Sequence, residues 1–550
     1  MDVASPTGPC SARPPAASTE ALAAGSLETG STRWLALTLA GLVALLALAV
    51  GLPAGSGAPG AGQALAGPDE EEDEEGGADE EAPPDLGEKD VPFIEQVNEA
   101  IEKGTHWLLA RGKIFEIPGA RDEPQGAHYG FIQSKTLYGG GTGPGYPHPA
   151  GATALALYTL LKCDVEPSHG VIERGFSWLK LRHRITEQWD KQGEYDPFTW
   201  THTEAGSSYE ISAMILALTA KYDQKKHTGT SRKKLRIRDK DDQEWLVELV
   251  QGLVERRGVP AQDAPPAERL GWRYNTPSIQ LGGGGGGRGR ATSSKTRTVT
   301  VPPHANQDLS STQLAALALY NAQRFGVDVD PQVWLDIAEF TLSHQEESGP
   351  DHERHDPGLA RGGYAAPKDK ARGFMYIKGS PDRSEGRATG SMTACGISNL
   401  LMCRDVLANH RKTKRTFETS PLAAQMEKAV WDGLAWLDRN WSSFDNRNSG
   451  VGYHTYYLYA LERTMDMLGK QLVGKRLWYQ EGAEQLLKRM QRTTSQVPDK
   501  KMQPEAMDTA FWETKSTHEP YDVLDTCFAL LFLKRATRGV MPPPAAVTGN

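Results

Sequence analysis

Titratable side chains gather just ahead of the last strongly apolar segment of the chain. The group comprises His518, Glu519, Tyr521, Asp522, Asp525, Thr526 and Cys527. Carboxylates serve as general acids or bases, and zinc accepts carboxylate, thiolate and imidazole ligands. Asp522 and Asp525 are therefore the candidate catalytic residues. The alternative is structural, because either aspartate could cap a helix while Cys527 packs in the core.

A second group of candidates is aromatic. The stretch from Tyr453 to Tyr459 holds four tyrosines and one histidine. Such rings could stack on a carbohydrate or shape an apolar pocket, and we take Tyr453, His454, Tyr457 and Tyr521 as the candidate ligand-binding residues. The same rings could instead fill the centre of the domain.

The elements that must position these residues follow a repeated pattern. An aliphatic residue, a glycine and a tryptophan-hydrophobic pair recur at offsets of 0, 3, 6 and 7, which is one face of a helix. The glycine allows a neighbouring helix to approach closely. The pattern occurs in the segments AIEKGTHWLL from Ala100, VIERGFSWLK from Val171 and AVWDGLAWLD from Ala429, and looser amphipathic versions occupy 244–256, 331–345 and 477–490.

Segments of another kind lie between them and are apolar nearly all round. They occupy 152–161, 208–220, 311–320, 391–403, 453–461 and 525–533. A helix without a polar face is buried on all sides. Each apolar segment follows one amphipathic segment, so the sequence predicts an all-α domain of six outer-inner helix pairs. Closing these pairs into a ring would bury the inner set.

This alternation resembles the α/α toroid superfamily of squalene and hopene cyclases and protein prenyltransferase β subunits, over residues 92–537. The resemblance implies an α/α toroid for the domain. Three turn segments also resemble the ends of the cyclases' glutamine-tryptophan repeats, although the full glutamine-to-tryptophan spacing is not kept. They are Gly271-Trp272-Arg273-Tyr274, Gly362-Gly363-Tyr364 and Gly450-Val451-Gly452-Tyr453.

The resemblance also bears on the acidic cluster. The segment from Asp522 to Thr526 resembles the cyclases' Asp-x-Asp-Asp-Thr motif, with Leu524 in place of the central aspartate that donates the proton. Asp525 and Cys527 match the Asp-x-Cys zinc pair of prenyltransferases, which requires a histidine further downstream. The chain supplies none there, so His454 or His518 would have to complete the set. Zinc is thus a possible cofactor on Asp525, Cys527 and His454, and enzymatic activity stays open.

The N-terminal part divides into three segments. Residues 1–33 are predicted to be flexible, and 34–53 form a predicted transmembrane helix, because a charge-free run of this length spans about 30 Å of hydrocarbon. Arg33 on its N-terminal side places the N-terminus in the cytoplasm and the C-terminal domain outside it. A cleaved signal peptide is the alternative. Residues 54–91 are an acidic linker rich in Pro, Gly and Ala.

The formal net charge of −9 arises largely in this linker, where residues 69–90 hold thirteen acidic residues and one basic residue. The rest of the chain is near neutral, which argues against a nucleic-acid partner. Insertions are predicted near 225–242 and 282–304, and a flexible tail at 538–550. Cys395 and Cys403 are too far apart on one helix for a disulfide and are expected to be core thiols.

Three functions fit these observations. The first is a membrane-anchored toroid that binds or transforms an isoprenoid or other apolar ligand. The second is a non-catalytic protein-interaction module. The third is a polysaccharide lyase or glycosidase on a helical toroid, for which a basic, open cleft would be expected. The chain lacks the Cys-Gly-Glu-Gln thioester motif, which excludes the complement-like toroids.

Overall fold

A computed structural model describes the chain over several ranges, all within one compact unit, Leu42–Asn550. Twelve helices and ten short strands lie in these ranges, so the predicted helical character is confirmed. The described residues are 91–115, 128–131, 149–185, 208–223, 235–255, 257, 271–273, 278–281, 297–300, 307–355, 367–378, 386–449, 452–514 and 522–536.

The helices alternate between two kinds, as the sequence predicts. The inner helices are α2 (Pro149–Lys162), α4 (Ser208–Tyr222), α6 (Leu309–Arg324), α9 (Gly390–Asn409), α11 (His454–Leu468) and α13 (Asp522–Leu533). They are buried nearly all round; in α13 only Leu524 and Phe528 keep partial exposure. The outer helices are α1 (Val91–Arg111), α3 (Gly170–Ile185), α5 (Lys240–Glu255), α7 (Pro331–Ser343), α10 (Pro421–Arg439) and α12 (Trp478–Arg489).

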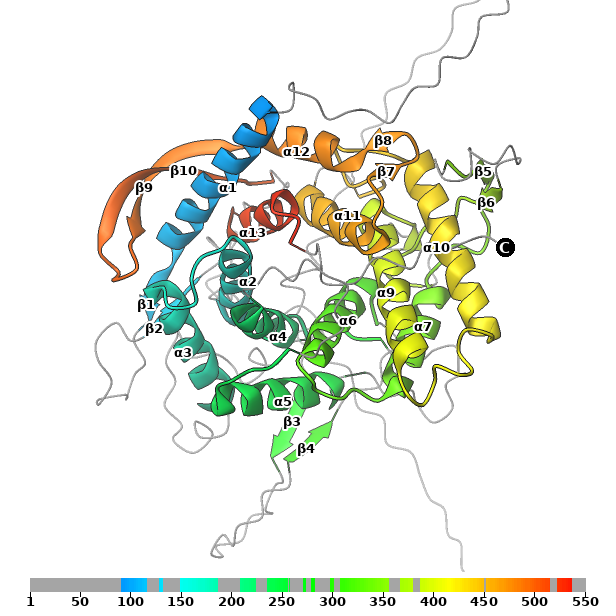
Figure 1. Cartoon of the computed structure of the whole chain (residues 1–550), viewed down its shortest axis with the longest axis horizontal. Coiled ribbons are helices and arrows are strands. Elements are labelled where there is room, and N and C mark those ends of the chain that lie inside the picture. Colours follow the sequence, from blue (N-terminus) through cyan, green and yellow to red (C-terminus); the bar gives the residue numbers. More distant parts are fainter. Residues whose placement is uncertain are drawn as a thin grey trace, which may run out of the picture. The chain divides into compact units, whose positions relative to one another are not determined.

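The inner helices contact one another in a closed order. Successive contacts run from α2 to α4, α6, α9, α11 and α13, and α13 returns to α2. Figure 1 shows these helices around a common centre, with the outer helices at the periphery. Burial of a helix that has no polar face therefore needs no partner beyond its two inner neighbours and the outer layer.

Glycines set the distance between the two layers. A Cβ atom at Gly104 of α1 would lie 2.8 Å from Leu530 of α13, and one at Gly175 of α3 would lie 2.8 Å from Leu157 of α2. At Gly433 of α10 it would lie 2.9 Å from Ile397 of α9. The close approach that the repeated glycine predicts is confirmed in all three copies.

A buried aromatic residue tied to a threonine recurs ahead of the inner helices. The backbone N–H of Trp272 donates to Thr312 Oγ1 of α6 at 2.9 Å, and its indole N–H donates to the Leu253 carbonyl of α5 at 2.8 Å. Trp512 repeats this geometry with Thr526 of α13 (3.1 Å) and the Leu486 carbonyl of α12 (2.8 Å). The backbone N–H groups of Phe131 and Phe374 bond in the same way to Thr153 and Thr393. These contacts mark a structural repeat that links outer and inner layers.

The prediction of an all-α fold was too strict. Five two-stranded antiparallel sheets lie in the described parts: β1 (Lys113–Phe115) with β2 (His128–Gly130), β3 (Ser278–Leu281) with β4 (Arg297–Thr300), β5 (Asp351–Glu353) with β6 (Lys368–Lys370), β7 (Leu472–Val473) with β8 (Arg476–Leu477), and β9 (Gln491–Pro498) with β10 (Pro504–Phe511). The last pair is the longest and packs along α1. All five join or flank helices; β3 borders the insertion predicted near 282–304, and β4 lies within it.

Other predicted segments lie wholly or partly outside the described residues. These include 1–33, 34–53, the linker up to residue 90, most of 225–242 and the tail 538–550. The expected membrane localisation must be corrected, because no helix in the described ranges is both long enough and apolar enough to cross a bilayer. The most apolar of these, α13, has 12 residues, about 18 Å of helix at roughly 1.5 Å per residue.

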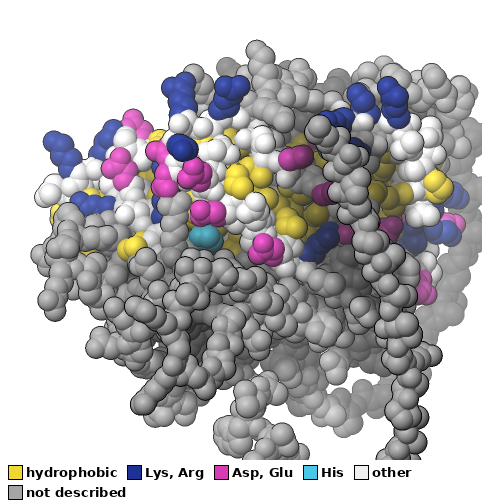
Figure 2. Space-filling view, turned by 90° about the horizontal axis from the view of Figure 1, so that it is seen from below, with side chains coloured by type: hydrophobic (Ala, Val, Ile, Leu, Met, Phe, Trp, Pro, Cys, Tyr) yellow, Lys and Arg dark blue, Asp and Glu magenta, His cyan; other side chains and the backbone are white. Residues whose placement is uncertain are grey.

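Charge is mixed on the molecular face shown in Figure 2. Lysine and arginine side chains gather along its upper edge, acidic side chains lie beneath them, and hydrophobic side chains lie between. Both signs of charge therefore occur together on the described part of this face.

Candidate functional site

The first predicted residue, Asp522, opens α13 and holds it to α1. Its Oδ2 atom accepts a hydrogen bond from Arg111 Nη2 at 2.8 Å, and its Oδ1 atom accepts one from the Val523 backbone N–H at 2.8 Å. Arg111 is the last residue of α1. Asp522 thus joins the end of an outer helix to the start of an inner one.

Asp525 lies one turn further along α13 and is 5% exposed. Its carboxylate accepts hydrogen bonds from the Thr455 hydroxyl of α11 and, at 2.6 Å, from the backbone N–H of Thr514. Burial raises the pKa of Asp525 above its ordinary value, and these hydrogen bonds oppose that rise. The side chain is therefore a buried acceptor that joins α13, α11 and the segment after β10.

Cys527 and His454 do not join Asp525 in one site. Cys527 is fully buried, and burial raises its pKa to about 12, with Thr159 of α2 as its hydrogen-bonding neighbour. His454 bonds through Nε2 to the Ser443 carbonyl at 2.8 Å and through Nδ1 to Arg489 at 2.9 Å. Among the described residues, no group of side chains positioned to hold a metal contains Asp525, Cys527 or His454.

The predicted ligand-binding tyrosines have separate positions. Tyr453 precedes α11 in a left-handed conformation with φ of 65°. Tyr457 is 2% exposed and packs against Gly390 at the start of α9. Tyr521, like His518 and Glu519, lies outside the described residues. Of this set, the structure describes Tyr453, His454 and Tyr457, which all lie at the start of α11.

Another residue of α11, Arg463, was not among the predicted site residues, and its environment is unusual for an arginine. Its side chain is fully buried, and Nε, Nη1 and Nη2 have no hydrogen-bond partner. The guanidinium lies over the ring of Tyr459, 4.3 Å from its centroid. An arginine has five N–H donors and stays protonated in proteins. Burying such a cation lowers the stability of the folded state by several kcal/mol, unless an anion or another hydrogen-bond acceptor compensates the charge.

Aromatic and thiol groups surround this arginine. Tyr459 stacks on Phe528 of α13 with ring centroids 5.7 Å apart, and Tyr456 meets the same ring edge-on at 5.4 Å. The Tyr456 hydroxyl lies 3.4 Å from Cys395 Sγ of α9. We call Arg463, Tyr459, Tyr456, Phe528 and Cys395 the central arginine site. Tyr456 and Phe528 keep partial exposure although both belong to inner helices.

The ionisable groups near Arg463 act on it through space, and none makes a hydrogen bond of regular geometry to it. Burial lowers the pKa of Arg463, but Tyr459, Cys395 and other ionisable neighbours more than offset this, and the net direction is upward. Glu462, the preceding residue, is buried and makes contacts of its own. The guanidinium nitrogens still lack an acceptor.

Further unpaired polar groups lie on α4 and α6. Tyr209 of α4 pairs with Ser310 of α6 at 2.5 Å between hydroxyl oxygens, and Ser310 donates to Asp308 at 2.8 Å. One turn further along each helix, Ser212 Oγ and both amide atoms of Gln313 are buried without a partner. Since buried polar groups are almost always hydrogen-bonded, these groups indicate a polar occupant, either ordered water or a ligand.

Asp308 behaves as the sequence suggests for a helix cap. It precedes α6 and accepts a hydrogen bond from the Ser311 backbone N–H at 2.7 Å. Burial raises its pKa, whereas Arg273 at 3.8 Å and the serine donors lower it. Cys395 and Cys403 are free, buried thiols, as predicted.

Arg463 was not among the predicted site residues, because the predicted inner segment ends at Leu461, before two charged residues. The structure continues α11 to Leu468. The sequence does contain a pattern that indicates this position. Tyr456, Tyr459 and Arg463 are spaced by 3 and 4 residues and so share one helix face. A charge on the same face as buried aromatic residues is the pattern that would have identified it.

A groove of about 640 Å³ lies elsewhere, lined by α1, the connection between α2 and α3, and the β9–β10 turn. Several of its charged side chains already pair with each other, as in Lys500 with Glu166 and Lys534 with Asp164, both at 2.5 Å. It contains none of the predicted site residues. We therefore place the candidate functional site around Arg463.

No protein-family model, curated protein or solved structure matches this chain.

Proposed function

We propose that the domain is an α/α toroid similar to the squalene cyclase and prenyltransferase superfamily. Two features support this architecture. The inner helices contact one another in a closed order, and the aromatic-threonine contact recurs ahead of four of them. A repeated unit that buries its apolar face only against neighbours is the physical basis of ring and solenoid proteins.

We infer that this toroid binds a ligand with an apolar body and an anionic group at the central arginine site. The observation that carries the inference is the buried Arg463 guanidinium, whose three nitrogens have no hydrogen-bond acceptor. Water could satisfy a buried serine or glutamine, but a buried cation that has no hydrogen-bonded partner is best offset by an anion bound directly to it. A carboxylate or phosphate fits the planar guanidinium in a bidentate geometry.

The surroundings of Arg463 favour an apolar ligand body. Tyr459, Tyr456 and Phe528 present aromatic surface beside the charge. Sites for small molecules combine apolar walls with a few polar anchors in this way. An isoprenoid diphosphate or carboxylate is the ligand class that satisfies both features.

The proposal is one of binding and does not require catalysis. Asp522 and Asp525 both hold helices together through hydrogen bonds, and Leu524 stands between them. Neither carboxylate contacts Arg463 in any described interaction. A cyclase-type proton donor is therefore not part of the proposed function.

The test is calorimetric titration of the full chain with three probes: farnesyl diphosphate, farnesol and an oligogalacturonate. We expect the diphosphate to bind more tightly than the alcohol. Arg463→Met should weaken diphosphate binding by at least about 30-fold, because truncating a buried charge pair costs roughly 2–5 kcal/mol. Arg492→Met is the matched control, since Arg492 is 56% exposed on β9.

Each other outcome has a defined meaning. Arg463-dependent binding of the oligogalacturonate alone would overturn the isoprenoid assignment in favour of a protein that acts on acidic sugars. Diphosphate binding that survives Arg463→Met would show that the anion binds elsewhere. If no probe binds, the interaction-module alternative replaces this proposal.

A further inference from the structure

A second constellation of potential ligands lies on the outer layer, away from the inner helices. His352 of β5 donates a hydrogen bond through Nε2 to Asp438 Oδ2 at 2.7 Å, and His355 Nδ1 lies 3.2 Å from the same oxygen. Asp438 is the penultimate residue of α10. One ligand atom from each of the three side chains lies within 4.8 Å of the others. Figure 1 shows β5 and β6 beside α10.

The backbone that carries the two histidines is firmly attached to α10. Arg354, between them, stacks on Trp431 of α10, with its guanidinium carbon 3.6 Å from the ring centroid. The same guanidinium makes two hydrogen bonds to Asp369 of β6, at 2.7 and 2.8 Å. Arg354 thus holds the segment that carries the two histidines to both α10 and β6.

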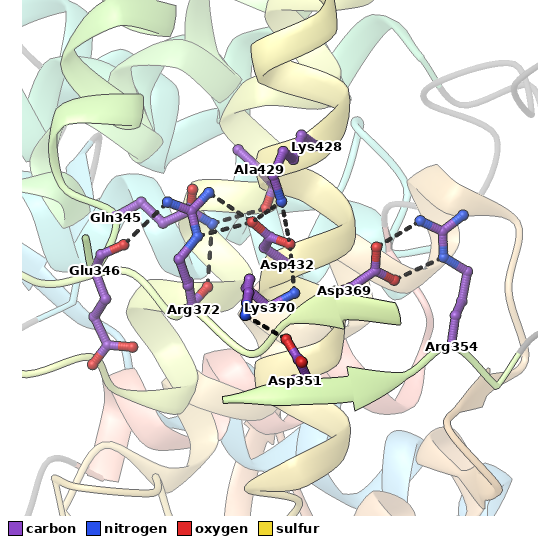
Figure 3. A network of polar contacts seen from close by, with 10 residues as sticks. All are labelled: Gln345, Glu346, Asp351, Arg354, Asp369, Lys370, Arg372, Lys428, Ala429 and Asp432. Carbon is purple, nitrogen blue, oxygen red and sulfur yellow. Dashed lines mark hydrogen bonds and ion pairs between the residues drawn. The ribbon is translucent and has the colours of Figure 1, made fainter. Parts of the chain in front are cut away.

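A network of polar contacts, drawn in Figure 3, anchors the next part of the hairpin to the same helix. The fully buried Asp432 of α10 accepts hydrogen bonds from the Lys370 backbone N–H at 2.9 Å and from Arg372 Nε at 2.8 Å. Lys428 adds an ion pair to Asp432 at 2.9 Å. Asp438 lies six residues further along this helix, so both sides of the constellation are tied to one rigid element.

A third element covers Asp438. The turn between β7 and β8 brings Gly474, with φ of 58°, directly against its carboxylate, so that a Cβ atom there would clash with Oδ1. The three side chains nevertheless remain accessible, with exposed fractions of 19% for His352, 18% for Asp438 and 39% for His355. An ion could therefore reach them from solvent.

The ligand types and spacing suit a transition metal. Two imidazoles and one carboxylate are the protein ligands of many three-ligand zinc sites, which keep a fourth position for water. Ligand atoms bound at about 2.0–2.2 Å to a tetrahedral ion lie roughly 3.4 Å apart, close to the separations seen here.

A second group of side chains among the described residues, made of three aspartates, is less suited to hold a metal ion. Asp239, Asp241 and Asp242 also lie close together, but Lys221 and the Tyr222 hydroxyl both bond to Asp242, at 2.8 and 2.5 Å. Lys180 pairs with Asp241 at 2.7 Å. A metal ion there would have to displace bound ammonium groups. No lysine or arginine pairs with Asp438 in any described contact, so its charge remains available.

We propose that His352, His355 and Asp438 form a binding site for one zinc-type divalent cation, with water in the fourth position. The ion joins the β5–β6 hairpin to the end of α10. The site is independent of the central arginine site, because it shares no residue with it.

The test is calorimetric titration of Zn²⁺ alone into the full chain, prepared without a histidine tag and treated with chelator. We expect one tight site per chain. Asp438→Asn and His355→Gln should each weaken binding by at least about 10–100-fold, as loss of a metal-site partner does. His410→Gln is the control, because His410 belongs to neither metal group.

Co²⁺ absorption provides a second readout that a folding defect would not imitate. The intact chain should give the strong visible bands of a four-coordinate ion, and His355→Gln should lose them while its circular dichroism stays unchanged. The proposal is overturned if no stoichiometric binding occurs, or if binding survives in both variants. Since His355 is the most exposed of the three ligands, its replacement is the one least expected to disturb folding.

Discussion

Replacement of Arg463 by methionine should stabilise the ligand-free protein. The variant has a side chain of similar length but no charge, so it removes a buried cation that has no hydrogen-bond acceptor. It also removes the contact with Tyr459 at 4.3 Å, which is worth about 2 kcal/mol when desolvated. The lost contact opposes the stabilisation, so both contributions must be compared.

The balance favours methionine. The effective cost of a buried ion is several kcal/mol, and apolar replacement of buried charges stabilises proteins by about 1–4 kcal/mol. After subtraction of about 2 kcal/mol for the cation–π contact, we expect a net gain of up to about 2 kcal/mol. With an unfolding entropy of about 2.1 cal/mol/K per residue, this corresponds to a rise in Tm of up to roughly 2 °C for a domain of this size.

The assay is thermal unfolding of the full chain in a buffer free of phosphate and carboxylate, so that no anion stabilises the unmodified protein. Arg492→Met, at an exposed position, should change stability by no more than about 0.5 kcal/mol. A clear fall in the Tm of Arg463→Met would refute the reasoning, because it would mean that the guanidinium is already satisfied in the free protein.

Three further predictions follow from other contacts. Gly104→Val should lower the free energy of unfolding by about 1–3 kcal/mol, because the valine side chain would overlap Leu530 and Trp512. Urea unfolding measures the change, with Glu102→Val as the control, and equal losses of stability in the two variants would contradict the prediction. Asp525→Ala should lower the free energy of unfolding by about 1–3 kcal/mol, because it leaves the backbone N–H of Thr514 buried and unpaired. Asp525→Asn keeps an acceptor and should lower it by about 1 kcal/mol or less. Equal losses of stability in urea unfolding would argue against this structural role of Asp525. Burial, and to a smaller extent Arg489, lowers the pKa of His454 to about 4, whereas the pKa is about 6.5 in the unfolded chain. Protonation of His454 therefore disfavours the folded state. The free energy of unfolding is at its full value above pH 6.5 and falls by about 3 kcal/mol as the pH falls towards 4. His454→Gln should flatten this part of the stability curve, and an unchanged curve would show that His454 is not the group responsible.

Much of the helical layering could be predicted from residue periodicity. The glycine in the segment from Ala429 to Asp438 marks a contact with Ile397, as its place in the pattern predicts. Periodicity works here because outer helices bury one face and inner helices bury all faces, and each leaves a distinct pattern. The order in which the inner helices contact one another follows from the same alternation.

The strands and the central arginine site were not predicted for different reasons. The β9–β10 pair has polar residues on both faces over much of its length, so it lacks the alternation that identifies a half-buried strand. Arg463 looked like the end of an apolar segment, because a charge usually marks the solvent-exposed part of a helix. Only the packing of α11 against its neighbours α9 and α13 turns that position into a buried one.

The acidic cluster shows the limit of motif comparison. Asp522 and Asp525 matched two family patterns in sequence, yet their hydrogen bonds go to Arg111 and to Thr514. Cys527 faces α2 while Asp525 faces α11, because residues two apart on a helix point in different directions. A linear match cannot reveal this, since it contains no information on which neighbour each side chain meets.

The measurement that tests the central claim most directly is the location of a bound oxyanion. Crystals of the full chain soaked in tungstate would reveal it by anomalous scattering. We predict a strong peak beside the Arg463 guanidinium, among Tyr459, Tyr456 and Phe528, and its loss in Arg463→Met crystals. Peaks confined to surface lysines and arginines, with none near Arg463, would contradict an anion-binding function at the central arginine site.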